Sequence, residues 1–183
     1  EAHDPNDESP FKGNVDLDAL EALIQRVGAD RIPYVCIAGT VNMAGGQPMS
    51  MANTRAVREL TARHGIRVML DATRAVENAY FIQQREAGYS DKPVAEILRE
   101  YCSYTDGCTM SGKKDSLVNI GGWLALNDPH LYEEASNLVV VYESRHTYGG
   151  MAGRDREAME RGIVESVHDD VRTRDTLDDR PHV

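Results

Sequence analysis

The sequence is poor in the features that mark membrane, secreted and disulfide-rich proteins. No apolar run approaches the ~20 residues that a membrane-spanning helix requires. The acidic, polar start EAHDPNDESP predicts no secretory signal peptide. Cysteine occurs only three times, and an odd number without a signal peptide indicates a reducing compartment and no disulfide framework. We therefore expect a cytoplasmic chain that does not associate with membranes.

Lysine, and positive charge in general, is also scarce. Only four of the 20 basic residues are lysine, and 30 acidic residues bring the net charge to -10. Binding to a phosphate backbone needs the opposite balance, so we expect no nucleic-acid partner. The composition is otherwise that of a globular protein, with 41% hydrophobic and 27% charged residues, which excludes a wholly disordered chain. A length of 183 residues suits one domain, or one domain and a fragment.

The spacing of apolar residues predicts helices and strands that alternate along the chain. Helical spacing begins after Asp16, a capping residue, and ends at Gly28. Short apolar runs bounded by glycine or proline indicate buried strands. The expected helices cover residues 17–27, 50–64, 73–85, 93–101, 129–136 and 154–167, and the apolar runs cover residues 34–38, 66–70, 108–109, 117–126 and 138–142.

This alternation is typical of an α/β fold with three layers, in which helices cover both faces of a mostly parallel sheet. Residues 1–15 are polar and predict an extended lead-in, and residues 16–167 form the expected domain. Apolar residues become rare after Glu165, so residues 168–183 predict an acidic, disordered tail.

Three loops are expected at the carboxyl edge of the sheet, where functional groups gather in such folds. They cover residues 42–48, 71–74 and 111–115. In the third loop, Lys113 and Lys114 form either an exposed pair or a site where one desolvated lysine becomes a nucleophile toward a carbonyl group. Ser111 and Gly112 could place a hydroxyl and backbone N–H groups around a phosphate.

The other two loops leave similar alternatives open. Asp71 is either the cap of the helix that follows or a buried carboxylate that keeps a pyridine nitrogen protonated. Arg74 could balance a phenolate or phosphate oxygen, and Asn42 is either a turn residue or a hydrogen-bond donor to that phenolate oxygen.

In combination, these stretches resemble the β-eliminating lyases that contain tyrosine phenol-lyase and tryptophanase. The resemblance covers roughly residues 9–165. It rests on the strings PYVCIAGTVNMAGGQPMSMANTRAVREL, LDATRAVENAYFI, DGCTMSGKKDSLVNIGGWLA and YGGMAGRD. It implies an incomplete large domain of the aspartate-aminotransferase type, with pyridoxal phosphate as cofactor. Some strings are closer to tyrosine phenol-lyase and others to tryptophanase, with the tyrosine enzyme favoured.

The resemblance also implies roles for individual residues. Lys114 matches the lysine that bonds to pyridoxal phosphate and moves the α-proton of the substrate, while Lys113 and Ser111 match other residues of the cofactor loop. Asp71 matches the partner of the pyridine nitrogen, and Arg74 and Asn42 match partners of the ring hydroxyl oxygen. The backbone of Asn119 resembles a carbonyl ligand of an activating potassium ion.

The implied reaction is α,β-elimination of an aromatic L-amino acid to phenol or indole, pyruvate and ammonia, in a homo-oligomer that is a tetramer in this family. Family subunits are much longer than this chain, and the arginine that grips the substrate carboxylate has no counterpart in it. We therefore keep two alternatives: a non-catalytic fragment that serves as a cofactor-domain or assembly piece, and a different cofactor-dependent reaction such as transamination. The fragment alone is expected to be inactive.

Overall fold

The computed structural model describes residue 4 and residues 6–143 and 151–168. Its helices are α1 (Leu17–Val27), α2 (Met51–Arg63), α3 (Ala75–Arg85), α4 (Val94–Ser103), α5 (Pro129–Glu143) and α6 (Gly153–Glu165), with single 3-10 turns η1 (Ala29–Arg31) and η2 (Asn42–Ala44). Its strands are β1 (Tyr34–Ala38), β2 (Arg67–Asp71), β3 (Gly107–Ser111) and β4 (Gly122–Leu126). The predicted tail lies outside the described residues, apart from His168.

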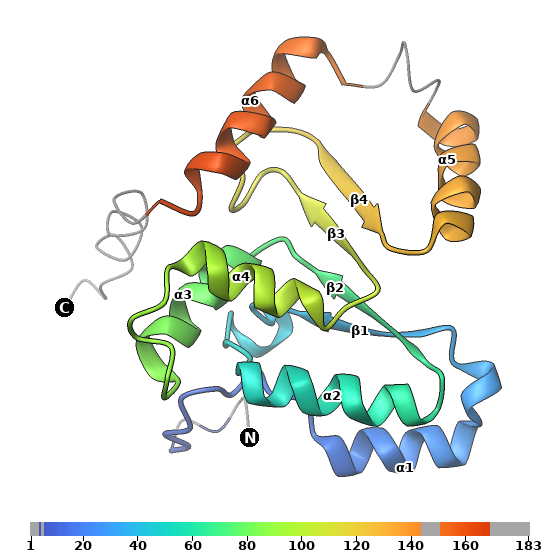
Figure 1. The fold of residues 1–183 in the computed structure, drawn as a ribbon, viewed down its shortest axis with the longest axis vertical. Helices are drawn as coiled ribbons and strands as arrows, with labels where there is room; N and C mark the ends of the chain where they lie inside the picture. The colour runs from blue at the N-terminus through green and yellow to red at the C-terminus, as the bar shows by residue number, and fades with distance from the viewer. Residues whose placement is uncertain (1–3, 5, 144–150, 169–183) are drawn as a thin grey trace.

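The four strands form one sheet in the order β1-β2-β3-β4 (Figure 1). Strands β1, β2 and β3 run parallel, and β4 pairs antiparallel with β3. The parallel pairs are separated in sequence by helices, as crossover connections require. The prediction of an α/β fold with a mostly parallel sheet is confirmed.

One face of the sheet packs against α2, α3 and α4. Ile37, Val68 and Leu70, from the two adjacent strands β1 and β2, belong to the same buried cluster as residues of all three helices. These helix residues are Met51, Val57, Ala75, Val76, Ala79, Ile82, Val94, Ile97 and Tyr101. On the alternate positions, Tyr34, Cys36, Thr109 and Leu124 are exposed. Within the described residues the sheet therefore has one covered face and one open face, as expected of an incomplete domain.

Local sequence explains where the first helices begin. Asp16 accepts a hydrogen bond from the Ala19 N–H at 2.9 Å, and Gly28, with φ of 90°, ends α1. Ser50 caps α2 through the Asn53 N–H. Capping residues of this kind satisfy N–H groups that lack partners within the helix.

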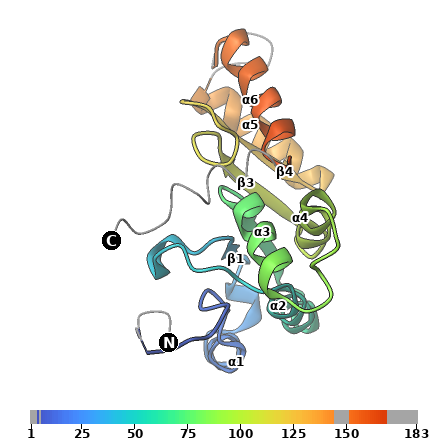
Figure 2. The ribbon, with the colours of Figure 1, turned by 90° about the vertical axis from the view of Figure 1, so that its left-hand side faces the viewer.

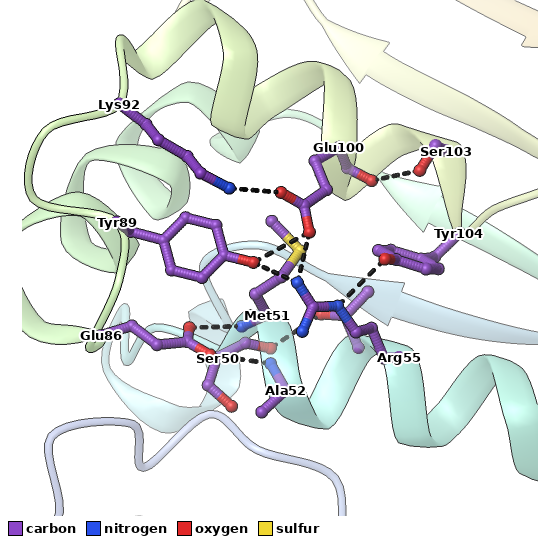
Figure 3. A network of polar contacts seen from close by, with 11 residues as sticks. Ser50, Met51, Ala52, Arg55, Glu86, Tyr89, Lys92, Glu100, Ser103 and Tyr104 are labelled. Atoms are coloured by element: carbon purple, nitrogen blue, oxygen red, sulfur yellow. Dashed lines mark hydrogen bonds and ion pairs between the residues drawn. The ribbon is translucent and has the colours of Figure 1, made fainter.

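A polar network also joins the start of α2 to α3 and α4 (Figure 3). The Glu86 carboxylate accepts hydrogen bonds from the Met51 N–H at 2.7 Å and the Ala52 N–H at 2.9 Å. Farther along α2, the Arg55 guanidinium forms an ion pair with Glu100 and donates a hydrogen bond to the Tyr89 hydroxyl. The helical layer is thus held together by charged and polar contacts as well as by its apolar core.

The prediction of a strand at residues 138–142 is wrong. These residues belong to α5, which packs beside β4. The helix that begins at Pro129 continues through them because extending an existing helix adds a hydrogen bond for each residue fixed. Figure 2 shows α5 and α6 at the β4 end of the molecule, away from α1 and α2. No helix of the described residues is both long and apolar enough to span a membrane.

Candidate active site

The candidate site lies where β1, β2 and β3 end. The strand register pairs Ala38 with Asp71, and Asp71 with Thr109. Asp71 therefore sits at the carboxyl edge of the central strand of the parallel part of the sheet. Partial burial of the sulfur and, second, the negative charge of Asp71 raise the pKa of the Cys36 thiol. Cys36 lies on the open face of the sheet, so the Asp71 charge acts on that face.

The structure does not support the alternative in which Asp71 caps α3. Asp71 Oδ1 accepts a hydrogen bond from the Thr73 N–H at 3.1 Å, within its own turn. Helix α3 begins at Ala75, and its N-cap residue, Arg74, makes no side-chain capping bond. The N–H groups of the first turn of α3, which have no partner within the helix, donate to a different carboxylate.

Asp115 supplies that cap from the β3–β4 loop. Its Oδ2 atom accepts hydrogen bonds from the Val76 N–H at 2.8 Å and the Glu77 N–H at 3.3 Å. A carboxylate at this position satisfies helix N–H groups and interacts favourably with the positive end of the helix dipole. Asp115, the residue after Lys114, thus connects the lysine loop to α3, the helix that follows the Asp71 turn.

Thr73 makes a second connection between the same two loops. Its hydroxyl oxygen accepts a hydrogen bond from the Ser111 N–H at 3.2 Å, and its carbonyl oxygen accepts one from the Asp115 N–H at 3.5 Å. The loop that begins at Ser111 is therefore fastened to the loop that begins at Asp71 on both sides of the two lysines.

The two adjacent lysines differ in exposure. Lys113 is exposed, whereas Lys114 is half-buried. The alternative of a simple exposed pair therefore describes Lys113 and not Lys114. Lys114 also begins a turn, because its carbonyl oxygen accepts the Leu117 N–H at 2.9 Å.

Arg74 shows what kind of ligand suits this site. Its Nη1 atom lies 3.4 Å from Glu77 Oε2, but its Nε atom is buried without a hydrogen-bond partner in the described structure. The Thr40 hydroxyl, just beyond β1, is also buried without a hydrogen-bond partner in the described structure. Buried polar groups of native proteins normally have partners, so these two atoms fit a ligand with oxygen acceptors. A lysine amine and a carboxylate partner for the pyridine nitrogen are groups that pyridoxal-phosphate sites use.

Asn42 belongs to a loop that is fastened to α3 at its far end. The Asn78 side chain, fully buried, accepts the Met49 N–H at 2.8 Å and donates to the Met49 carbonyl oxygen at 3.0 Å. Asn42 itself is exposed in η2 and takes no part in the hydrogen bonds that join the other two loops. The hydrogen bonds of the described residues therefore join the loop of Asp71 and Arg74 to the loop of Ser111 and Lys114, and Asn42 is not part of this connection.

Asn119 lies in the same loop as Lys114 and is exposed. This loop is closed by hydrogen bonds from the Gly112 N–H to the Gly121 carbonyl oxygen at 2.8 Å and from the Val118 N–H to the Gly112 carbonyl oxygen at 3.3 Å. The described residues contain no group of three His, Cys, Asp or Glu side chains placed to hold a metal ion. The proposed cation ligand of Asn119 is a backbone carbonyl, so its role stays a prediction.

The sequence analysis assigned no role to three residues that organise the site: Thr73, Asn78 and Asp115. Asp115 stands next to the lysine pair, and Thr73 between Asp71 and Arg74, so proximity along the chain was the available signal. For Asn78, a buried amide among apolar helix positions was the signal, since such a group needs hydrogen-bond partners.

Comparison with known proteins shows the family to which the chain belongs. The model of the β-eliminating lyase family matches residues 2–175. The chain belongs to the β-eliminating lyases. It is 74% identical over 170 residues to a tyrosine phenol-lyase of Nostoc punctiforme, a match that covers 93% of this chain and 36% of the relative. A tyrosine phenol-lyase of Symbiobacterium is 65% identical over 170 residues, with 93% and 37% covered, and one of Pasteurella multocida is 63% identical over 167 residues, with 91% and 36% covered.

The residues matched by the β-eliminating lyase family include all the candidate site residues, from Asn42 to Asn119. The chain spans a little over a third of the length of the curated relatives it matches.

Proposed function

We propose that this chain forms the cofactor-binding part of a pyridoxal-phosphate-dependent lyase that eliminates the aromatic group from an aromatic L-amino acid. The arrangement of Lys114, Asp71 and Arg74 at one sheet edge, with an unpartnered buried Arg74 Nε, is the observation that carries the proposal. The relatives reported above are tyrosine phenol-lyases, which favours tyrosine over tryptophan as substrate. The products would then be phenol, pyruvate and ammonia.

Each of these residues would have a distinct role. When bound, pyridoxal phosphate supplies an electron sink for the charge left when the α-proton departs. Lys114 Nζ would hold the cofactor aldehyde and carry the α-proton, and the Asp71 carboxylate would hold a proton at the pyridine nitrogen. Arg74 Nε would donate to the ring hydroxyl oxygen.

The remaining assignments extend this arrangement. Asn42 would donate to the same ring hydroxyl oxygen as Arg74, while Ser111 and Lys113 would face the phosphate. The Asn119 carbonyl would bind potassium. We also propose a cytoplasmic homo-oligomer.

Covalent labelling tests the assignment of Lys114. Borohydride fixes the bond between a lysine Nζ and the aldehyde carbon of pyridoxal phosphate, and peptide mass mapping then identifies the lysine. We expect label on Lys114 in preference to Lys113, because Lys114 is half-buried beside Asp115 and Lys113 is exposed. A Lys114→Arg variant should lose the selective label, and a Lys113→Arg variant should keep it. Label on Lys113 alone, or spread evenly over all four lysines, would contradict the assignment.

The second candidate is a non-catalytic fragment that binds cofactor weakly. It is favoured by one observation, that the matches cover only about 36% of the relatives. Pyruvate release from tyrosine, tryptophan and an S-alkyl cysteine, measured on the purified 183-residue chain with cofactor and potassium, separates the two candidates. Selective labelling of Lys114 without turnover supports the fragment, whereas robust turnover of any of these substrates supports a complete enzyme.

A further inference from the structure

We propose that Asp115 is a positioning residue, which holds Lys114 in place against Asp71 and Arg74 by capping α3. The proposal rests on the function proposed above and concerns how the lysine is placed. It assigns Asp115 no contact with substrate or cofactor.

The first observation is where the α3 cap comes from. Helices are usually capped by the residue just before them, whose side chain binds the N–H groups two or three positions on. In α3, Asp115 binds the Val76 N–H from 39 positions away in the sequence. Because the cap belongs to the lysine loop, removing it would loosen the helix start and the loop together.

The second observation is that the lysine loop is anchored on both sides. Ser111 is bound through its N–H to the Thr73 hydroxyl, and Asp115 is bound through its carboxylate to α3. Only Gly112, Lys113 and Lys114 lie between these anchors. A shift of the Lys114 backbone relative to the Asp71 turn would therefore break at least one of these hydrogen bonds.

The third observation concerns charge. The start of α3 carries the positive end of a helix dipole, and a carboxylate there is stabilising. If Asp71 served as this cap, its carboxylate would be committed to the helix. Asp115 fills the position, so the Asp71 carboxylate bonds within its own turn at the sheet edge.

The test compares Asp115→Ala with a matched control. Asp16→Ala removes a cap of the same kind from α1, where Asp16 Oδ1 accepts the Ala19 N–H at 2.9 Å. Both variants of the 183-residue chain are melted thermally and are labelled with pyridoxal phosphate and borohydride. We expect both to melt earlier than the wild type, but only Asp115→Ala to lower the ratio of label on Lys114 to label on Lys113, by roughly fivefold or more.

Two further variants keep the test decisive if Asp115→Ala does not fold. Asp115→Asn retains an oxygen acceptor and should restore most of the selectivity. Thr73→Val keeps the Asp115 cap but removes the acceptor for the Ser111 N–H, and it should lower the labelling ratio with less effect on melting.

The outcomes separate the two proposals. If the wild-type chain labels its lysines evenly, the proposed function fails. If the wild type labels Lys114 selectively and Asp115→Ala is as selective as Asp16→Ala, then Asp115 is merely a cap and the positioning role is overturned. Where Asp115→Ala does not fold, a Thr73→Val variant as selective as Asp16→Ala would show that fastening the lysine loop to the Asp71 turn does not place Lys114, which also overturns the proposal.

Discussion

Replacing Asp71 with alanine should damage catalysis far more than folding. A suitable context is a chimaera in which the 170 matched residues of this chain replace their counterparts in the tyrosine phenol-lyase of Nostoc punctiforme, to which they are 74% identical. In this setting the matched residues have the rest of the relative around them, so elimination can be measured directly.

The structure sets the scale of both effects. Asp71 accepts one hydrogen bond, from the Thr73 N–H, and its side chain is only half-buried. Loss of such a bond costs about 0.5–1.5 kcal/mol of unfolding free energy. If Asp71 holds the proton at the pyridine nitrogen as proposed, removing the carboxylate deprotonates that nitrogen and weakens the electron sink. We expect elimination to slow by roughly 10²-fold or more, which corresponds to about 2.7 kcal/mol in the barrier.

Two measurements on the same variant check this split. Pyruvate release from tyrosine reports catalysis, and urea unfolding reports stability. Asp16→Ala is the matched control, because that residue also accepts one backbone N–H but lies at the start of α1, and its loss should lower stability by a similar amount without slowing elimination. Activity of Asp71→Ala within about threefold of the wild type would show that Asp71 only shapes its turn.

Two other predictions concern the scaffold around the site. Asn78→Ala leaves the buried Met49 N–H and carbonyl oxygen without partners, so it should lower the unfolding free energy by about 2–5 kcal/mol, measured by urea unfolding beside the near-isosteric Asn78→Asp. Burial acts to raise the pKa of Asp106, but hydrogen bonds from Arg58 and from the Val68 N–H outweigh it and lower that pKa. The stability that Asp106 contributes should therefore be present at neutral pH and be lost as the pH falls below about 4. Asp106→Asn should cost about 1–2 kcal/mol near pH 7 and progressively less in acid; a constant difference across the pH range would show that the charge is irrelevant.

Local patterns in the sequence predicted much of the fold. Asp16, Ser50 and Gly28 act within a few residues of the helix ends that they set, so the bounds of α1 and α2 follow from neighbouring residues. The parallel strands were recognisable as short apolar runs, and parallel strands end at a common edge. For that reason the sequence alone predicts that the loops carrying Asp71 and Lys114 lie at the carboxyl edge of the sheet.

Contacts between segments that lie far apart in the sequence could not be predicted from local patterns. The cap of α3 comes from a loop 39 residues away, and no spacing rule connects Val76 with Asp115. Composition also misled at residues 138–142, because a run rich in valine suits a strand and yet forms the last part of α5. These residues are exposed, so extension of the helix that begins at Pro129 outweighs their weak preference for strands.

The choice between two adjacent lysines is a backbone effect that composition could not decide. Gly112 is buried, and a Cβ atom there would lie 3.0 Å from Val118 Cγ2 and 3.1 Å from Met159 Sδ, so the loop passes this point tightly packed. Lys113 then turns outward and is exposed, and Lys114 returns half-buried next to the anchored Asp115. Two side chains of identical chemistry thus differ in solvation by virtue of one position in the chain. Lys114 is thus the lysine that the Asp115 anchor holds in place, and for that reason we assign the bond to the cofactor to Lys114 and not to Lys113.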